Sequence, residues 1–180
     1  MLGAADALPE ETKKKLTDYI YSLQLESGGF SCSQLYRNNG YELPHIVFTY
    51  SALNCLKILG DDLGRLNKPS LLDSVRKCQQ EDGSFSSFRN TDEADLRFVY
   101  AAVSICRLLN SLESVDIEKS FAYIRSCYNP DGGFGLRPGC ESHTGAIYCA
   151  VSSCKLLGRI GELPTGDILH FLVCRQTYNT

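Results

Sequence analysis

The 180 residues carry 18 Lys and Arg against 21 Asp and Glu, which gives a formal net charge of −3. This acidic balance argues against a nucleic-acid-binding surface, which is normally basic. A content of 43% hydrophobic and 22% charged residues is typical of a soluble globular protein of one domain. The sequence contains no apolar run of about 18 residues, so we predict no membrane span. The short N-terminus lacks the basic region and the long apolar region of a secretory signal.

The nine cysteines indicate reduced thiols and a cytoplasmic protein, because their number is odd and no Cys-x-x-Cys pair occurs. Cys55, Cys106, Cys149 and Cys154 fall inside apolar helical stretches, where a free cysteine behaves as a small hydrophobic residue. We therefore expect these thiols to serve in packing.

A short pattern occurs three times: the end of a helical stretch, a polar turn, two small residues and a Phe. The three phenylalanines, Phe30, Phe85 and Phe134, recur at intervals of 55 and 49 residues. A fourth copy begins at Val173–Gln176, where Cys174 follows Cys127 by 47 residues. A repeat of this length indicates one supersecondary unit stacked several times.

In chain order, each repeat predicts two helices. Pro9 opens the first, Gly60 and Gly158 follow two of the apolar helices as stop signals, and no alternating β pattern is sustained. The expected helices cover about 9–23, 44–59, 70–79, 95–109, 116–127, 143–157 and 165–174. We assign residues 1–180 to one partial domain with repeats at about 9–60, 66–110 and 115–158, and a truncated repeat at 163–180.

The two helices of each pair differ in polarity. The first carries charges, as at Lys13–Lys15, whereas the second is apolar nearly all round, as in Phe98–Leu109. Because a helix that is apolar on most sides is enclosed by others, the alternation favours an all-α fold of two concentric layers, an α/α toroid. The alternative is an open solenoid of the HEAT or armadillo kind, whose repeats need no Gly-Gly-Phe turn.

Polar clusters stand at or just before the start of each enclosed helix, at His45, at Asp92–Arg97 and at Glu141–His143. In an α/α barrel these helix starts face one end of the central cavity, where unpaired N–H groups and the helix dipole favour anions. His143 and Arg97 are therefore candidate anion donors. The alternative for Arg97 is structural, with Asp95 and Arg97 capping and balancing their own helix.

Tyr50, Tyr100 and Tyr148 follow these polar groups by about one turn. They would line a cavity wall above an apolar floor, although a tyrosine taken singly is more often a core residue than part of a ligand wall. An apolar pocket with an anion site at one rim suits a prenyl diphosphate.

A zinc site at Cys140–His143 is the competing interpretation. Zinc needs three or four protein ligands, and His45 and His170 have no cysteine at ligand spacing. We therefore predict no complete metal site in this chain. No phosphate-binding Gly-x-x-x-x-Gly-Lys motif and no Gly-x-Ser-x-Gly elbow occurs either.

These motifs resemble the protein prenyltransferase β subunits. The segment 131–145 is similar to their diphosphate-proximal repeat, which ends in Glu-(Ser/Ala)-His-Gly-Gly, and 49–54 and 95–102 match two inner-helix signatures. The segment 58–68 looks most like the type I geranylgeranyltransferase β subunit. The resemblance extends from about Tyr19 to Gln176.

The resemblance implies a six-hairpin barrel that pairs with a helical α subunit, of which this chain holds about three hairpins and the first helix of a fourth. The family transfers a prenyl group, here geranylgeranyl from its diphosphate, to a Cys near the C-terminus of substrate proteins, through a zinc-bound thiolate. By resemblance, His143 contacts the diphosphate beside Thr144 and Gly145. Arg97 and Tyr100 line the isoprenoid and peptide cavity, to which we also assign His45, Tyr50 and Tyr148.

Two departures from the family pattern stand out. Thr144 occupies a position where the family usually has Gly, and the family's zinc ligands and main diphosphate-binding Arg, Lys and Tyr belong to repeats beyond Thr180. We therefore expect zinc only in the full-length protein and no catalysis by this chain alone. An alternative is a non-catalytic module that binds an α subunit or a prenylated partner. A terpenoid-cyclase relative is disfavoured, because Gly60–Asp62 does not supply the acidic motif of those enzymes.

Overall fold

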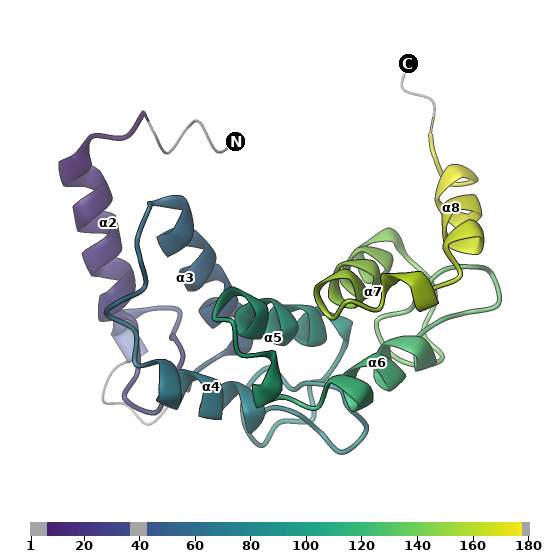
Figure 1. Ribbon diagram of the computed structural model, residues 1–180, viewed down its shortest axis with the longest axis horizontal. Coiled ribbons are helices and arrows are strands. Elements are labelled where there is room, and N and C mark those ends of the chain that lie inside the picture. Colours follow the sequence, from purple (N-terminus) through teal and green to yellow (C-terminus); the bar gives the residue numbers. More distant parts are fainter. Residues whose placement is uncertain (1–6, 37–42, 178–180) are drawn as a thin grey trace. The chain divides into compact units, whose positions relative to one another are not determined.

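The computed structural model describes residues 7–36 and 43–177. Residues 1–6, 37–42 and 178–180 of the predicted domain, including most of the N-terminus interpreted above, lie outside the described residues. Figure 1 shows a chain of helices joined by loops and three short 3-10 turns. The helices are α2 (Glu10–Ser22), α3 (Ile46–Ile58), α4 (Lys68–Arg76), α5 (Leu96–Leu108), α6 (Ile117–Ser126), α7 (Thr144–Leu156) and α8 (Thr165–Val173).

All seven predicted helices are present, and β structure in the described ranges is limited to isolated bridges. The all-α prediction is therefore confirmed. The largest difference concerns α4, which was expected over 70–79 and instead covers Lys68–Arg76. It begins earlier because the Asn67 side chain accepts a hydrogen bond from the Ser70 N–H. It ends earlier because Gln79 already belongs to the bridge with Phe85.

The repeated turn has the same construction in each copy. An isolated antiparallel bridge joins a residue two or three positions after the helix end to the phenylalanine of the turn, as in Tyr128 with Phe134. All three ring-bearing residues, Phe30, Phe85 and Phe134, have no exposed surface. The apolar residue that ends each turn is thus a core anchor, which is the reason the pattern recurs.

A glycine in each turn makes this construction possible. Gly28, Gly83 and Gly132 have φ values of 92°, 90° and 86°, a region that residues with a Cβ rarely adopt. A Cβ on Gly132 would also lie 2.6 Å from the carbonyl oxygen of Asp167, the third residue of α8. Gly28 and Gly83 abut the third residues of α4 and α6 in the same way. Each turn therefore packs against the first turn of the helix that opens the next pair.

The chain divides into two compact units, which are described separately. Unit 1 contains residues 1–78 and 87–91, and unit 2 contains residues 79–86 and 92–180. In unit 2, α5 packs along α7. Both helices carry small side chains without exposed surface, and these are Ala102, Cys106, Ala146, Ala150 and Cys154.

In unit 1, α3 is less enclosed than its sequence predicts. Phe48, Ser51, Cys55 and Ile58 follow helical spacing and form one exposed face. The expectation that Cys55 serves in packing is therefore wrong, because its side chain lies on this face. Cys106, Cys149 and Cys154 are buried as expected. No helix within the described ranges is both long and apolar enough to cross a membrane.

Candidate functional site

The starts of α5 and α7 lie close together in unit 2. The Leu96 N–H at the start of α5 donates to the carbonyl oxygen of Leu136, in the loop before α7, at 3.0 Å. Farther along the two helices, the hydroxyl oxygens of Tyr100 and Tyr148 lie 3.0 Å apart. Each tyrosine follows its own N-cap, Asp95 or His143, by five residues. The two helices therefore run side by side in register.

His143 is the N-cap of α7. Its Nδ1 atom accepts a hydrogen bond from the Ala146 N–H at 3.2 Å, and its own N–H donates to the Phe134 carbonyl oxygen at 3.1 Å. A ring nitrogen that accepts carries no proton, so the neutral ring holds its proton on Nε2. The residue is exposed. The structure thus presents an Nε2–H donor at a helix N-terminus.

The loop before His143 is fixed by a network of polar side chains. The Ser142 hydroxyl donates to Asp131 Oδ1 at 2.8 Å, and the Asn129 amide donates to Ser142 Oγ and to the Cys140 carbonyl oxygen, both at 2.8 Å. Hydrogen bonds from the Gly133 N–H and from Ser142 hold the pKa of the Asp131 carboxyl below its usual range. The carboxylate of Asp131 therefore holds the loop that leads to His143 in place.

Thr144 and Gly145 form the first turn of α7, and both are exposed. The N–H groups of a first turn have no partner within the helix, and they stand at the positive end of its dipole. A Cβ on Gly145 would lie 3.2 Å from Nδ1 and Cε1 of His143. The missing side chain of Gly145 thus leaves room for the capping ring.

The start of α5 holds a closed charge pair instead. Asp95 accepts from the Arg97 N–H at 2.8 Å, and the Arg97 guanidinium donates to both carboxylate oxygens, the shortest contact being 2.6 Å from NH2 to Oδ2. The carboxylate of Asp95 is 2% exposed, whereas the Arg97 side chain is 54% exposed. The hydrogen bonds to Asp95 raise the pKa of Arg97. The capping alternative therefore describes Asp95 and Arg97 correctly.

The two tyrosines of unit 2 form a pair. The Tyr100 and Tyr148 ring centroids lie 5.3 Å apart in an edge-to-face arrangement. The hydrogen bond to Tyr100 and partial burial raise the pKa of the Tyr148 phenol, which is 59% exposed. Beside them, burial raises the pKa of the Cys149 thiol to about 11. The pair offers an apolar surface edged by hydroxyl groups.

The remaining predicted site residues lie in unit 1. His45 caps α3 as His143 caps α7, because its Nδ1 accepts from the Val47 N–H at 3.2 Å. Its ring lies 4.5 Å from the Phe48 ring, centroid to centroid. Tyr50 is half-buried, and its carbonyl oxygen accepts from the Asn54 amide. The structure therefore brings six of the eight predicted residues together on α5 and α7.

The described residues do not fit a zinc site. No group of three or more His, Cys, Asp or Glu side chains in these residues could hold a metal ion. His170 and Cys174, one turn apart on α8, bring Sγ within 3.6 Å of Nε2 and supply only two ligands. We therefore derive no step through zinc from this structure.

Sequence reasoning missed the support of His143 by Asp131 and Ser142. A signal was present in the repeat, because Asp82 occupies the same place as Asp131 one turn pattern earlier and accepts from the Ser84 N–H at 2.9 Å. The second contact, from Ser142, depends on how the loop 136–142 folds back. That path has no counterpart in the repeat pattern.

The family described as "Prenyltransferase alpha-alpha toroid domain" matches residues 1–180. The chain belongs to this family. Its membership confirms the toroid interpretation over the open solenoid. A "Geranylgeranyl transferase type-1 subunit beta" of Arabidopsis thaliana is 50% identical over 125 residues, which cover 69% of this chain and 32% of the relative. The protein of the same name from Dictyostelium discoideum is 41% identical over 204 residues, 98% of this chain and 58% of the relative.

Among solved structures, "Candida albicans protein geranylgeranyltransferase-I complexed with GGPP" matches with a TM-score of 0.86. At 24% identity this similarity supports the fold, over 96% of this chain and 53% of that chain. The chain thus spans between about a third and somewhat over half of the length of these relatives.

Proposed function

We propose that this prenyltransferase chain is part of the β subunit of a type I protein geranylgeranyltransferase. That enzyme transfers a geranylgeranyl group from its diphosphate to a Cys near the C-terminus of substrate proteins. Membership of the family and the names of two relatives support the reaction class. The start of α7 supports the place of the diphosphate.

The observation that carries the proposal is the His143 cap. Its Nδ1 atom is occupied by the Ala146 N–H, so Nε2 can donate to a diphosphate oxygen. The backbone N–H groups of the first turn, which contains Thr144 and Gly145, add further hydrogen-bond donors. The helix dipole at this end also favours a bound anion. Negative charge grows on the diphosphate as its bond to the isoprenoid breaks, and fixed donors at that place stabilise the transition state.

The isoprenoid and peptide cavity would begin at the tyrosine pair. Tyr100 and Tyr148 supply ring surface one turn beyond the helix starts. Arg97 would shape this wall rather than bind the leaving group, because its guanidinium already balances Asp95. We also propose a prenyltransferase α subunit and Cys-box proteins as partners, and a cytoplasmic location.

In the intact enzyme, zinc would bind the substrate Cys thiol and favour its deprotonation to the thiolate. The described residues do not provide its ligands, and the proposal assigns them no metal chemistry. What it assigns to this chain is the binding and orientation of the diphosphate and the isoprenoid.

Equilibrium binding of geranylgeranyl diphosphate tests the proposal, measured on the purified chain with and without a prenyltransferase α subunit. We expect saturable binding that is tighter than binding of farnesyl diphosphate and of inorganic pyrophosphate. Equal affinity for geranylgeranyl diphosphate and pyrophosphate would show that no isoprenoid cavity contributes. Absence of binding under both conditions would overturn the function as well.

The second candidate function is partner binding without catalysis. Leu169 and Val173 on α8 favour it, since their side chains are 61% and 66% exposed. Size-exclusion chromatography with an α subunit distinguishes it from the first. A complex that forms but binds no prenyl diphosphate would favour this second function.

A further inference from the structure

Unit 2 contains two copies of the junction at which the repeated turn meets the first helix of the next pair, and the first copy is closed. The Gln79 side chain bonds both backbone groups of Asp116, the N-cap of α6. Its Oε1 accepts from the Asp116 N–H at 2.8 Å, and its Nε2 donates to the Asp116 carbonyl oxygen at 2.9 Å and to Ser120 Oγ at 3.0 Å. These three hydrogen bonds seal the contact between turn and helix.

The second copy cannot form this seal. Tyr128 stands at the position of Gln79, because each pairs with the phenylalanine of its own turn. Pro164 stands at the position of Asp116, because each precedes the first residue of its helix. A proline has no N–H to donate. The Tyr128 hydroxyl reaches past it to Asp167 Oδ2 at 3.1 Å.

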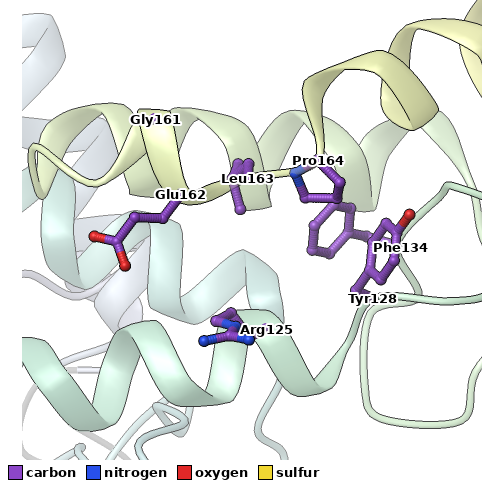
Figure 2. A pocket seen from close by; sticks show the side chains of 7 residues that line it. All are labelled: Arg125, Tyr128, Phe134, Gly161, Glu162, Leu163 and Pro164. Atoms are coloured by element: carbon purple, nitrogen blue, oxygen red, sulfur yellow. The ribbon is translucent and has the colours of Figure 1, made fainter.

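A cavity of about 410 Å³ lies at this second junction (Figure 2). Figure 2 shows Pro164, Phe134 and Tyr128 gathered at one end, with Arg125 of α6 and Glu162 farther along the cavity. The ring of Phe134 is fully buried and meets Tyr128 edge to face at 5.3 Å. The cavity thus has an aromatic floor and a charged mouth. Its volume falls in the usual range for small-molecule sites.

The charges at the mouth are not equivalent. Arg159 donates to Glu162 and to Glu118 and lies 4.2 Å from the Phe121 ring centroid. These hydrogen bonds from Arg159 hold the pKa of the Glu162 carboxyl below its usual range. Arg125 has no carboxylate oxygen within the 4.0 Å of an ion pair in the described part of the chain. Arg125 acts on Glu162 only through its charge and lies 6.0 Å from the Phe121 ring centroid, so its guanidinium N–H groups remain available to a carboxylate.

We propose that this cavity binds a compact aromatic carboxylate. The ring would lie against Tyr128 and Pro164, because Phe134 has no exposed surface, and an edge-to-face contact with the Tyr128 ring favours a flat aromatic group. The carboxylate would pair with Arg125, whose planar guanidinium can donate two parallel hydrogen bonds. The site goes beyond prenyl transfer, because it uses none of the residues assigned to the diphosphate or the isoprenoid.

Titration of the purified chain with 3-phenylpropionate tests this assignment. A ligand of this size that is well matched binds with a dissociation constant on the order of 0.1–1 mM. The neutral 3-phenylpropionamide and the cationic 2-phenylethylamine serve as matched probes, and we expect both to bind at least tenfold more weakly. Equal or tighter binding of the amine would assign the mouth to Glu162 and overturn the proposal. Equal binding of the amide would remove the role of Arg125.

Two variants localise the binding. Arg125→Gln should weaken 3-phenylpropionate about tenfold while the melting temperature stays unchanged, since the side chain is exposed. Arg76→Gln is the matched control, because Arg76 holds the same place two residues before the cysteine of the preceding repeat. It should bind like the unsubstituted chain. Equal loss in both variants, or no loss in Arg125→Gln, would contradict the assignment.

The double variant Tyr128→Gln with Pro164→Asp restores the residues of the closed junction. It should seal the cavity as Gln79 and Asp116 seal the first copy, so binding should disappear. Circular dichroism verifies that the variant is folded. Undiminished binding by the folded double variant would place the ligand elsewhere and overturn the proposal. If the double variant does not fold, the Arg125→Gln and Arg76→Gln pair decides alone.

Discussion

The starts of α5 and α7 occupy equivalent places in neighbouring repeats, yet they differ in charge and in availability. Asp95 and Arg97 close the start of α5 as an ion pair whose carboxylate is 2% exposed. His143 caps α7 as a neutral ring with one nitrogen bonded and the other directed away from the cap. One helix start is thus saturated, while the other retains donors for a ligand.

The comparison shows how a repeat can keep its fold and vary its chemistry. An N-cap needs only an acceptor for the first-turn N–H groups, and both a carboxylate and an imidazole nitrogen meet that need. The carboxylate then attracts a cation and excludes anions. The imidazole leaves a donor, and the anion site follows α7 alone.

The largest expected effect comes from breaking the closed start. Asp95→Ala removes the cap of α5 and leaves Arg97 with only the longer ion pair to Glu93, at 3.9 Å. We expect the free energy of unfolding to fall by about 2 kcal/mol. The loss of the cap accounts for about 1 kcal/mol, and breaking the ion pair with the buried carboxylate adds to it. The 54% exposure of Arg97 keeps the cost below that of a fully buried pair, since water can solvate its charge.

Urea unfolding of Asp95→Ala measures this loss. Asp116→Ala is the matched control, because Asp116 caps α6 through the Lys119 N–H without a buried ion pair. It should cost about 1 kcal/mol. Equal losses in the two variants would show that the pair with Arg97 adds nothing beyond capping.

The open start should respond in binding rather than in stability. His143→Asn keeps a capping oxygen, so the free energy of unfolding should change by less than about 0.5 kcal/mol. It loses the long reach of Nε2, so the affinity for geranylgeranyl diphosphate should fall about tenfold, or about 1.4 kcal/mol, as expected for one charge-assisted hydrogen bond. His143→Ala should lose the same affinity and also the cap. Unchanged affinity in both variants would remove His143 from the diphosphate site.

The contrast between these two helix starts was only partly accessible from the sequence. Helix positions followed from periodicity, from Pro9 and from the two glycine stops, and all seven helices were predicted because local signals agreed with the repeat. Both interpretations of Arg97 could be stated, as an anion donor and as a capping partner. Choosing between them required the position of the guanidinium, and its contact with Asp95 supports the capping interpretation.

Other features of the molecule depend on contacts between distant segments and could not be predicted. The pairing of Tyr100 with Tyr148 joins two repeats 48 residues apart. The exposure of Cys55 depends on which face of α3 other segments cover. The junction at Pro164 is open because proline has no N–H to donate. The missing hydrogen bond is recognised only by comparison with the junction at Asp116, where the backbone N–H donates to Gln79. The periodicity of a sequence predicts which face of a helix is buried, but it does not predict which residue a given side chain contacts.

Gly145→Ala should change the stability of α7 and the affinity for the ligand in opposite directions. Alanine favours the helix over glycine by about 0.5–1 kcal/mol, and the added Cβ would lie 3.2 Å from an exposed ring that can move. We therefore expect a chain that is more stable by about 0.5 kcal/mol but binds geranylgeranyl diphosphate more weakly, because the His143 ring is displaced. Thermal melting and ligand titration measure the two changes. Tighter binding would show that His143 has the wrong orientation in the unsubstituted chain.

The smallest expected effect concerns the loop that leads to the open start. The Gly133 N–H and the Ser142 hydroxyl lower the pKa of Asp131, so the folded chain binds its proton less readily than the unfolded chain. The carboxylate therefore stabilises the fold above the unfolded pKa of about 3.9, and the contribution disappears as the pH falls through the lower folded value. Asp131→Asn should flatten the decline of stability below about pH 4 and leave the slope near neutrality unchanged. A variant that retains the full acid slope would assign that slope to other carboxylates, because Asp131 would then have the same pKa in the folded and unfolded chain.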